Sequence, residues 1–239
     1  MKPLISIIIP TCGSYDDLLK SCLLSIMEYT DLHNVEIIVV NNTERNIEEA
    51  TKFARMNLDI KLISYPKKMG FPFAVNRGIE IAQGKYIILL NNDTILLPQP
   101  KNDWINKLIY PFLIDDKIGI TGVFKKHIPE INRNFILFFC AMISRKVISD
   151  IGLLDENLQE GYADDMDFCI RAEDAGYKIV SVPTDEIANN FDGKLYLSEF
   201  PIYHNGGATF HEIPESNKIY DKNFAYFLNK YKNDHHRNI

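Results

Sequence analysis

Short apolar runs alternate with segments of helical spacing over residues 4–95, and this alternation limits the fold more than any other feature. The apolar runs lie at residues 4–10, 35–40, 60–64 and 86–90. Runs of this kind, rich in β-branched residues, are typical of strands that are buried on both faces. The segments expected to be helical lie between them, at about residues 15–29, 46–56 and 73–82. The alternation predicts an α/β fold with a mostly parallel central sheet and helices on both of its faces.

The second half of the chain has a different rhythm, which begins after Pro98 and Pro100. Helices are expected at residues 103–114, 145–151 and 164–175, and strands at residues 118–123, 135–144 and 177–182. A polar loop that contains Lys125, Lys126 and His127 separates the first two of these strands, and residues 183–202 have no regular pattern. No linker is long or polar enough to separate independent domains. We therefore expect one domain over residues 1–239, with two halves that meet near residue 97.

Composition and charge exclude several classes of protein. The net charge is −6, so no basic field favours nucleic acid as a partner. Four widely spaced cysteines without a CxxC pair are typical of reduced cysteines in a cytosolic protein, and not of disulfides or a zinc site. No run reaches the roughly 18 apolar residues of a membrane span. The apolar run at the N-terminus is too short for a signal peptide, so a cytoplasmic protein is expected.

The first polar cluster, Asn91-Asn92-Asp93, directly follows the apolar run at residues 86–90. In open α/β sheets, ligands bind at the carboxyl edge where such strand ends emerge. A carboxylate there can hold Mg²⁺ or Mn²⁺, with water and the phosphates of a ligand completing the coordination. The alternative is a simple turn, since Asn and Asp both favour turns.

Two further clusters could carry chemistry. The segment GYADDMD places Asp164, Asp165 and Asp167 at an expected helix start, where acids also serve as caps. A helix start does not require three of them, and such crowding is common where a carboxylate acts as a base or binds metal. His204 precedes Asn205-Gly206-Gly207. A lone histidine is more often structural, but glycines allow the backbone to approach a ligand closely.

Seven segments, taken together and in order, identify a family. They are ISIIIPT, VEIIVVNN, GFPFAVNRGI, GKYIILLNNDT, FCAMISRKVISDIGLLDENL, GYADDMDFCIRAEDAGYKI and YHNGGATF, and they cover most of residues 4–210. In these segments the chain resembles the family-2 glycosyltransferases, inverting enzymes of GT-A fold, and within them the rhamnosyltransferase-like branch. The resemblance implies a Rossmann-like sheet with a smaller acceptor-side subregion. It also implies transfer of a hexosyl or deoxyhexosyl group from a nucleoside-diphosphate sugar to an acceptor hydroxyl, in cell-surface or polysaccharide glycan synthesis.

The resemblance also implies roles for individual residues. Asp93 would contact a divalent metal, Mn²⁺ or Mg²⁺, with His204 as a further ligand, and Asp165 would be the general base. Residues 1–97 would bind the donor, and residues 98–239 would bind the acceptor and supply the base. Candidates on the acceptor side are Tyr162, Asp164 and Asp167. The residues that would line the nucleotide-sugar pocket are Pro10, Thr11, Cys12, Gly13, Asn41, Gly70, Phe71, Asn76, Asn91, Asn92 and Asp93.

This sequence departs from the family pattern at two positions. Asn91 replaces the first acid of the metal-binding motif, and Asn41 stands where relatives that read uracil often have Asp. Asn can still accept a hydrogen bond from a base N–H. We therefore expect UDP or dTDP as the nucleotide, with GDP as the alternative, and a glycan or lipid-linked acceptor.

The sequence leaves open two other functions and two arrangements of the C-terminal segment. A sugar nucleotidyltransferase would carry a basic, glycine-rich loop after the first strand, whereas this chain has TCGS. A sugar-nucleotide or glycan-binding module that has lost catalysis is consistent with Asn91. Residues 220–231 form an amphipathic segment with aromatic residues and flanking lysines. That segment either packs on the domain, which is the commoner arrangement, or makes a peripheral contact with a membrane that presents a lipid-linked acceptor.

The pKa of Asp165 should reflect two opposing influences. The helix dipole should keep its carboxylate ionised, whereas Asp164 and Asp167 should raise its pKa toward a value useful for a base.

Overall fold

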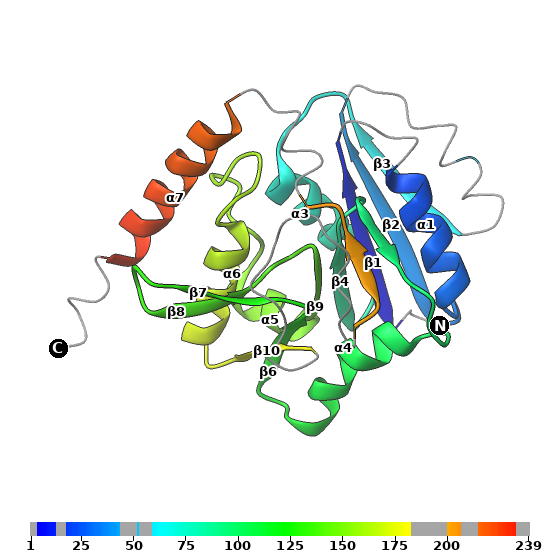
Figure 1. The fold of residues 1–239 in the computed structure, drawn as a ribbon. Helices are drawn as coiled ribbons and strands as arrows, with labels where there is room; N and C mark the ends of the chain where they lie inside the picture. Colours follow the sequence, from blue (N-terminus) through cyan, green and yellow to red (C-terminus); the bar gives the residue numbers. More distant parts are fainter. Residues whose placement is uncertain are drawn as a thin grey trace.

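The protein is described by a computed structural model that covers residues 4–12, 18–43, 52, 59–182, 200–206 and 215–232. Within this part, seven strands form a central sheet in the order β10-β6-β9-β4-β1-β2-β3 (Figure 1). Every neighbouring pair is parallel except the two that involve β9, which is antiparallel to β4 and β6. The sheet strands are β1 (Ile5–Thr11), β2 (Val35–Asn42), β3 (Ile60–Tyr65), β4 (Tyr86–Leu90), β6 (Ile118–Gly122), β9 (Cys140–Ser144) and β10 (Lys178–Ser181). This is the mostly parallel α/β sheet that the alternation predicts.

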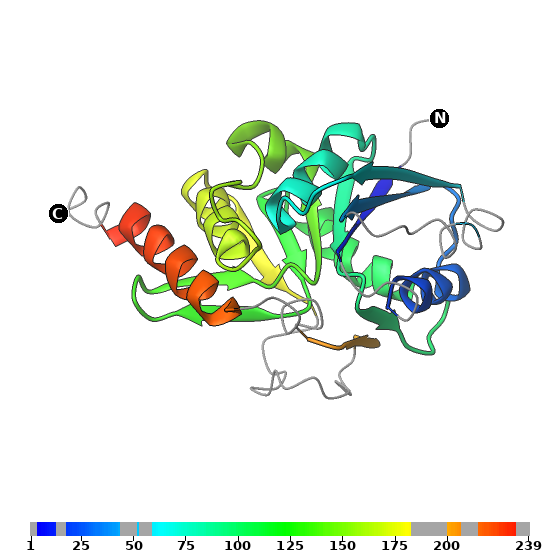
Figure 2. The same ribbon diagram turned by 90° about the horizontal axis from the view of Figure 1, so that it is seen from above.

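Helices cover both faces of the sheet, because alternate residues of the apolar strands point to opposite faces. On one face, Ile7 and Ile9 pack with residues of α1 (Leu18–Tyr29) and α4 (Asp103–Ile114). On the other face, Ile8 packs with residues of α3 (Phe71–Ile81), α5 (Arg145–Ile151) and α6 (Asp164–Asp174). Figure 2 shows α1 and α3 on opposite sides of the sheet. With both faces covered, the strand ends remain as the place for a ligand.

Three elements outside the sheet shape the region beyond those strand ends. β5 (Thr94–Leu96) and β11 (Ile202–His204) form an antiparallel ribbon. β7 (Lys125–Ile128) and β8 (Arg133–Ile136) form a hairpin. The C-terminal helix α7 (Ser216–Lys232) lies beside α6 and this hairpin in both views (Figures 1 and 2).

Helix α7 packs on the domain. Phe227 and Tyr231 are buried and belong to the same apolar core as α6. The packed arrangement of this segment is therefore confirmed, and these two aromatic rings are not available to a membrane surface. None of the helices in the described ranges has the length and apolar character needed to cross a membrane.

The prediction of one strand over residues 135–144 is wrong, because the structure divides this run between β8 and β9. Phe138 and Phe139 lie between the two strands and are buried in different cores, so the run stays apolar through a turn. An apolar run alone cannot reveal such a break. The polar loop expected at residues 125–127 is also wrong, since these residues belong to β7. The helix expected at residues 46–56 lies outside the described residues except for Lys52, which is helical.

Candidate active site

Polar residues at the ends of three neighbouring strands meet at one edge of the sheet. Thr11 of β1 is in register with Asn41 of β2. Asn92, just beyond β4, donates a hydrogen bond from Nδ2 to Thr11 Oγ1 over 2.9 Å. These residues and Asp93 are all buried. Thr11 and Asn41 therefore lie along the same edge of the sheet as Asn92 and Asp93.

The β5–β11 ribbon brings His204 to Asp93. His204 pairs with Thr94, the first residue of β5, and the backbone N–H of Asn205 donates to Asp93 O over 3.1 Å. His204 Nε2 consequently lies 3.1 Å from Asp93 Oδ1. The imidazole also stacks on Phe139, with ring centroids 4.3 Å apart and an interplanar angle of 7°. Two residues predicted as metal ligands from distant parts of the sequence are therefore adjacent.

The chemistry of this pair fits a divalent metal. Asp93 Oδ1 and Asn91 Oδ1 are buried, and no described residue makes a well-oriented hydrogen bond to either oxygen, although His204 Nε2 lies 3.1 Å from Asp93 Oδ1. Such burial is costly unless a cation or donor satisfies the oxygen. Adjacent ligands of an octahedral Mg²⁺ or Mn²⁺ lie about 3 Å apart, close to the spacing of Asp93 Oδ1 and His204 Nε2. Among the described residues, no group of three or more His, Cys, Asp or Glu side chains is arranged so that it could hold a metal ion by itself. A metal here would therefore need water and the phosphates of a ligand as well.

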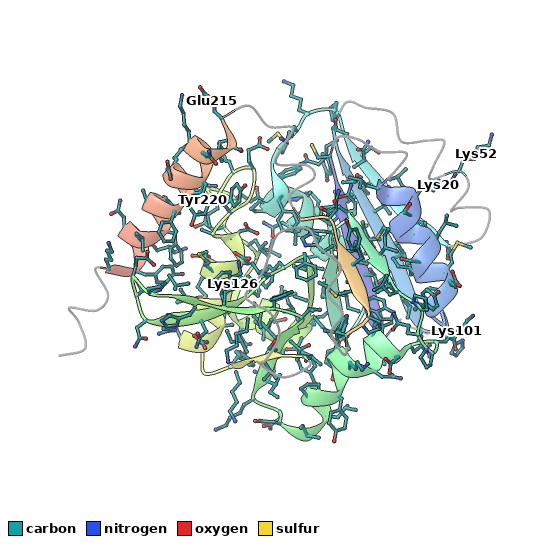
Figure 3. The ribbon with its side chains drawn as sticks, viewed as in Figure 1. Lys20, Lys52, Lys101, Lys126, Glu215 and Tyr220 are labelled. Atoms are coloured by element: carbon teal, nitrogen blue, oxygen red, sulfur yellow. The ribbon has the colours of Figure 1, made fainter. Side chains whose placement is uncertain are left out.

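A cavity of about 720 Å³ opens next to this pair. Asn91 and His204 form part of its wall, and Tyr162, Asp164 and Asp165 approach from the start of α6. The β7–β8 hairpin contributes Lys126 and its neighbours to the wall, and α7 contributes Tyr220 and Phe224. Figure 3 labels Lys126 on the hairpin and Tyr220 on α7. The structure thus places the candidate base and the candidate metal ligand His204 in the wall of one cavity.

The environment of Asp165 raises its pKa to about 7, and burial within the protein is the main cause. Part of the side chain remains open to the cavity. A hydrogen bond from the backbone N–H of Met166 to Asp165 Oδ1, 2.8 Å long, and the charge of Lys126 act in the opposite direction. Burial, followed by the charge of Asp165, raises the pKa of Asp164 well above its ordinary value. The upward direction predicted for the pKa of Asp165 is correct, but burial and not the neighbouring acids is the main reason.

Comparison with known proteins now decides the family. Residues 6–137, more than half of the chain, match the family described as Glycosyl transferase family 2. The chain belongs to glycosyl transferase family 2. An uncharacterized glycosyltransferase of Haemophilus influenzae is 28% identical over 130 residues, which are 54% of this chain and 38% of that protein. The chain spans less than half the length of the curated relatives that it matches.

Solved structures of other glycosyltransferases support the GT-A fold. A mannosyltransferase from Pyrobaculum calidifontis in complex with GDP-Man and Mn²⁺ is 18% identical, with a TM-score of 0.61 over 77% of this chain and 55% of that one. GalNAc-T7 with UDP, GalNAc and Mn²⁺ is 15% identical, with a TM-score of 0.62 over 76% of this chain and 43% of that one. These identities are low, so the likeness concerns the fold alone. The rhamnosyltransferase-like branch stays a prediction.

The residues predicted to line the nucleotide-sugar pocket of this family member fall into three groups. Phe71 and Asn91 line the cavity together with His204 and the start of α6. Gly13 lies outside the described residues. The others lie outside the cavity wall, at the sheet edge, in the segment before α3 or within α3: Pro10, Thr11, Cys12, Asn41, Gly70, Asn76, Asn92 and Asp93. Their contact with a nucleotide sugar stays a prediction.

Three predicted residues make internal contacts instead of facing the cavity. The Asp167 carboxylate is bound by Arg171 Nε at 2.8 Å, Lys230 Nζ at 2.6 Å and the Tyr231 hydroxyl at 2.7 Å. The Asn76 amide exchanges hydrogen bonds with the backbone of Leu154, at 2.9 and 3.0 Å. A Cβ atom on Gly70 would come within 2.6 Å of the backbone nitrogen of Glu160, so this glycine permits a close approach of two loops.

Sequence reasoning missed several residues of the cavity wall and one contact near the sheet edge. Tyr220 and Phe224 are four residues apart on α7, which predicts a core-facing stripe and not a cavity wall. Asn42 accepts from the N–H of Met69 and donates to Gly70 O, both over 2.9 Å, but its place in a pair of asparagines gave no sign of this. Lys126 lines the cavity from β7, a strand that the sequence pattern did not predict.

Proposed function

We propose that the chain is an inverting glycosyltransferase that moves a hexosyl or deoxyhexosyl group from a nucleoside-diphosphate sugar to an acceptor hydroxyl. One observation carries the proposal. A carboxylate with a pKa near 7, Asp165, faces the same cavity as Asn91 and His204, which adjoin the candidate metal ligand Asp93. The proposed location is the cytoplasm, since Cys22, Cys140 and Cys169 are buried and unlinked.

Asp165 acts as the general base in this mechanism. It removes the proton from the acceptor hydroxyl as the oxygen attacks the anomeric carbon from the face opposite the diphosphate, which inverts the configuration. A pKa close to neutral suits a group that must be ionised before the reaction and bind a proton during it. A bound Mg²⁺ or Mn²⁺, held by Asp93 and His204, would supply positive charge to the departing diphosphate.

The donor site belongs to the edge formed by β1, β2 and β4. The two solved neighbours carry GDP-Man with Mn²⁺ and UDP with Mn²⁺, which supports a nucleotide sugar and a divalent metal as a class. Because these neighbours carry different nucleotides, they do not decide between them for this chain. UDP or dTDP is our proposal from Asn41, which lies buried at the end of β2.

The acceptor site is the cavity between the β7–β8 hairpin and α7. Aromatic rings of Tyr162, Tyr220 and Phe224 contribute to its wall, and Tyr162 meets Tyr220 edge-on with centroids 5.2 Å apart. Flat apolar rings combined with hydrogen-bonding side chains suit a sugar, which has both C–H faces and hydroxyls. We therefore propose a glycan acceptor, free or lipid-linked, in the synthesis of a surface polysaccharide.

The site argues against the two rival functions. The raised pKa of the buried Asp165 favours a general base over a binding module, which gains nothing from it. A nucleotidyltransferase would need cations near the end of β1 for a triphosphate, and Thr11 and Cys12 occupy that end.

An assay of released nucleoside diphosphate tests the proposal. The chain is incubated with UDP-, dTDP- and GDP-sugars, with Mn²⁺ and with an excess of EDTA, and the anomeric configuration of the first transferred or released sugar is read by NMR. We expect release from at least one donor, loss of release in EDTA, and inversion. Release of pyrophosphate from a nucleoside triphosphate and a sugar phosphate would favour the nucleotidyltransferase. Binding without any release would favour the binding module.

A further inference from the structure

Four consecutive residues ahead of α6 have positive φ angles. They are Glu160 at 65°, Gly161 at 100°, Tyr162 at 67° and Ala163 at 65°. Only glycine adopts this region without steric cost, so three of the four residues are held in an unfavourable conformation. Such backbone persists only where surrounding contacts fix it. The turn leads directly into Asp164 and Asp165, so whatever fixes the turn also places the candidate base.

Asn223 of α7 contacts this turn. Its side chain is 2% exposed, and its Nδ2 donates to Gln159 O over 2.8 Å and to Gly161 O over 2.6 Å. A carboxamide nitrogen is a neutral atom with two hydrogens, so it can bind two carbonyls at once without burying a charge. Serine, threonine and aspartate cannot do this. Among these side chains, only the amide of Asn223 can donate to both carbonyls at once.

The turn also packs against the segment before α3. Gly70 approaches the backbone of Glu160 so closely that a Cβ atom would be 2.6 Å from its nitrogen. Lys68 Nζ also lies 2.7 Å from Glu160 Oε2. Asn223 and the residues around Gly70 thus contact the turn and restrict how it can move.

The helix that carries Asn223 is itself fixed to α6. Phe227 and Tyr231 are buried in the core shared with α6. Lys230 and Tyr231 both bind the carboxylate of Asp167, within the first turn of α6. Asn223 therefore makes its hydrogen bonds from a helix, α7, that is itself anchored to α6.

We propose that Asn223 is a positioning residue, whose amide holds the turn at residues 160–163 so that Asp165 faces the acceptor cavity correctly. The inference rests on the proposed function, because it assigns the effect to the candidate base. Asn223 is absent from the cavity wall and so acts through the backbone and not on the acceptor. A displacement of about 1 Å in a reacting group can cost on the order of 100-fold in rate. Loss of the amide should therefore lower turnover and leave the donor edge unaffected.

Two variants of Asn223 and two controls test this. Asn223→Leu keeps the approximate size but removes both hydrogens, and Asn223→Asp keeps the shape but cannot bind both carbonyls. Thr30→Val is the matched control, since it removes a different buried hydrogen bond, from Trp104 Nε1 to Thr30 Oγ1, at the contact of α1 and α4. Tyr226→Phe removes the 3.1 Å bond to Asp155 from the exposed side of α7. All four are measured well below their melting temperatures.

For both Asn223 variants we expect kcat to fall roughly 10- to 100-fold, with the Kd of nucleoside diphosphate and Mn²⁺ within about twofold of the wild type. Thr30→Val and Tyr226→Phe should keep kcat within about twofold. Hydrogen exchange is the second readout and needs no activity. The segment at residues 159–168 should exchange faster in the Asn223 variants and not in the controls.

Unchanged exchange in this segment would overturn the proposal even if the wild type turned out to have no transferase activity. Faster exchange with an unchanged kcat in an active enzyme would overturn the positioning role as well. If Thr30→Val lost as much turnover as Asn223→Leu, the effect would be one of general stability and the proposal would again fail. Absence of turnover in the wild type, combined with faster exchange in the variants, would contradict the proposed function alone.

Discussion

Replacing Asp165 by Asn should stabilise the protein at alkaline pH. The pKa of Asp165 is about 7 in the folded protein, compared with an ordinary value of 3.8, because burial disfavours the charged form. The folded state therefore keeps a proton that the unfolded chain has released. The stability that this provides is complete below pH 3.8 and is lost as pH rises through about 7. Asn resembles the protonated acid, still accepts from Met166 N–H, and cannot ionise.

The size of the effect follows from the pH interval. Between pH 5 and the pKa near 7, the wild type loses stability over about two pH units, which at about 1.4 kcal/mol per unit gives an upper bound of about 3 kcal/mol. Because Asp165 is partly open to solvent, we reduce this to about 1 kcal/mol. For a domain of this size, 1 kcal/mol corresponds to roughly 2–4 °C in Tm. The difference in unfolding free energy between Asp165→Asn and the wild type should therefore grow by about 1 kcal/mol between pH 5 and pH 8.

Urea unfolding of both proteins at pH 5 and pH 8 measures this difference. Asp115→Asn is a control of opposite sign, since the hydrogen bonds from Lys178 and the Lys117 N–H lower the pKa of Asp115. Asp115 therefore stabilises the fold above its ordinary pKa, and its replacement should lower stability at both pH values. An Asp165→Asn advantage that stays constant between pH 5 and pH 8 would refute the reasoning about burial.

Three further predictions concern the metal pair and the contact of α6 with α7. Asp93→Ala should abolish Mn²⁺-dependent donor binding in calorimetry, and unchanged Mn²⁺ dependence would show that Asp93 is not a ligand. His204→Ala should weaken the affinity for Mn²⁺ in calorimetry, and a normal metal affinity in the variant would mean that His204 has a structural role only. Asp167→Ala should destabilise the fold by about 3–5 kcal/mol in urea, because it leaves Arg171, Lys230 and Tyr231 without their common partner; a loss below about 1 kcal/mol would mean that these side chains find other partners.

Local sequence patterns predicted the sheet and its polar edge. The apolar run of β4, followed by Asn91, Asn92 and Asp93, was enough to predict a buried strand with a polar end. Both features depend on residues that are neighbours in the sequence. The bounds of α4 and α5 followed in the same way from helical spacing. The two apolar faces of the sheet then required helices on both sides.

Long-range contacts could not be predicted in this way. β5 and β11 have three residues each. Their pairing brings together Thr94 and His204, which lie in different halves of the chain. The turn before α6 contains Glu160, Tyr162 and Ala163 at positive φ, where their residue types predict the opposite. The role of Asn223 depends on how α7 packs, which its own amphipathic pattern does not specify. The residues of the site were therefore partly predictable, but the contacts that position Asp165 were not.

The pH dependence of turnover in wild type and Asp165→Asn tests the central claim most directly. With donor and Mn²⁺ saturating, the ionised fraction of a group of pKa about 7 rises from about 10% at pH 6 to about 90% at pH 8. We predict that the wild-type kcat rises about tenfold over this interval and levels off above it. We predict that Asp165→Asn binds donor normally, with kcat lower by roughly 10²–10⁴-fold and without this rise. A variant that kept near-normal turnover with the same pH profile would contradict the assignment of Asp165 as the base.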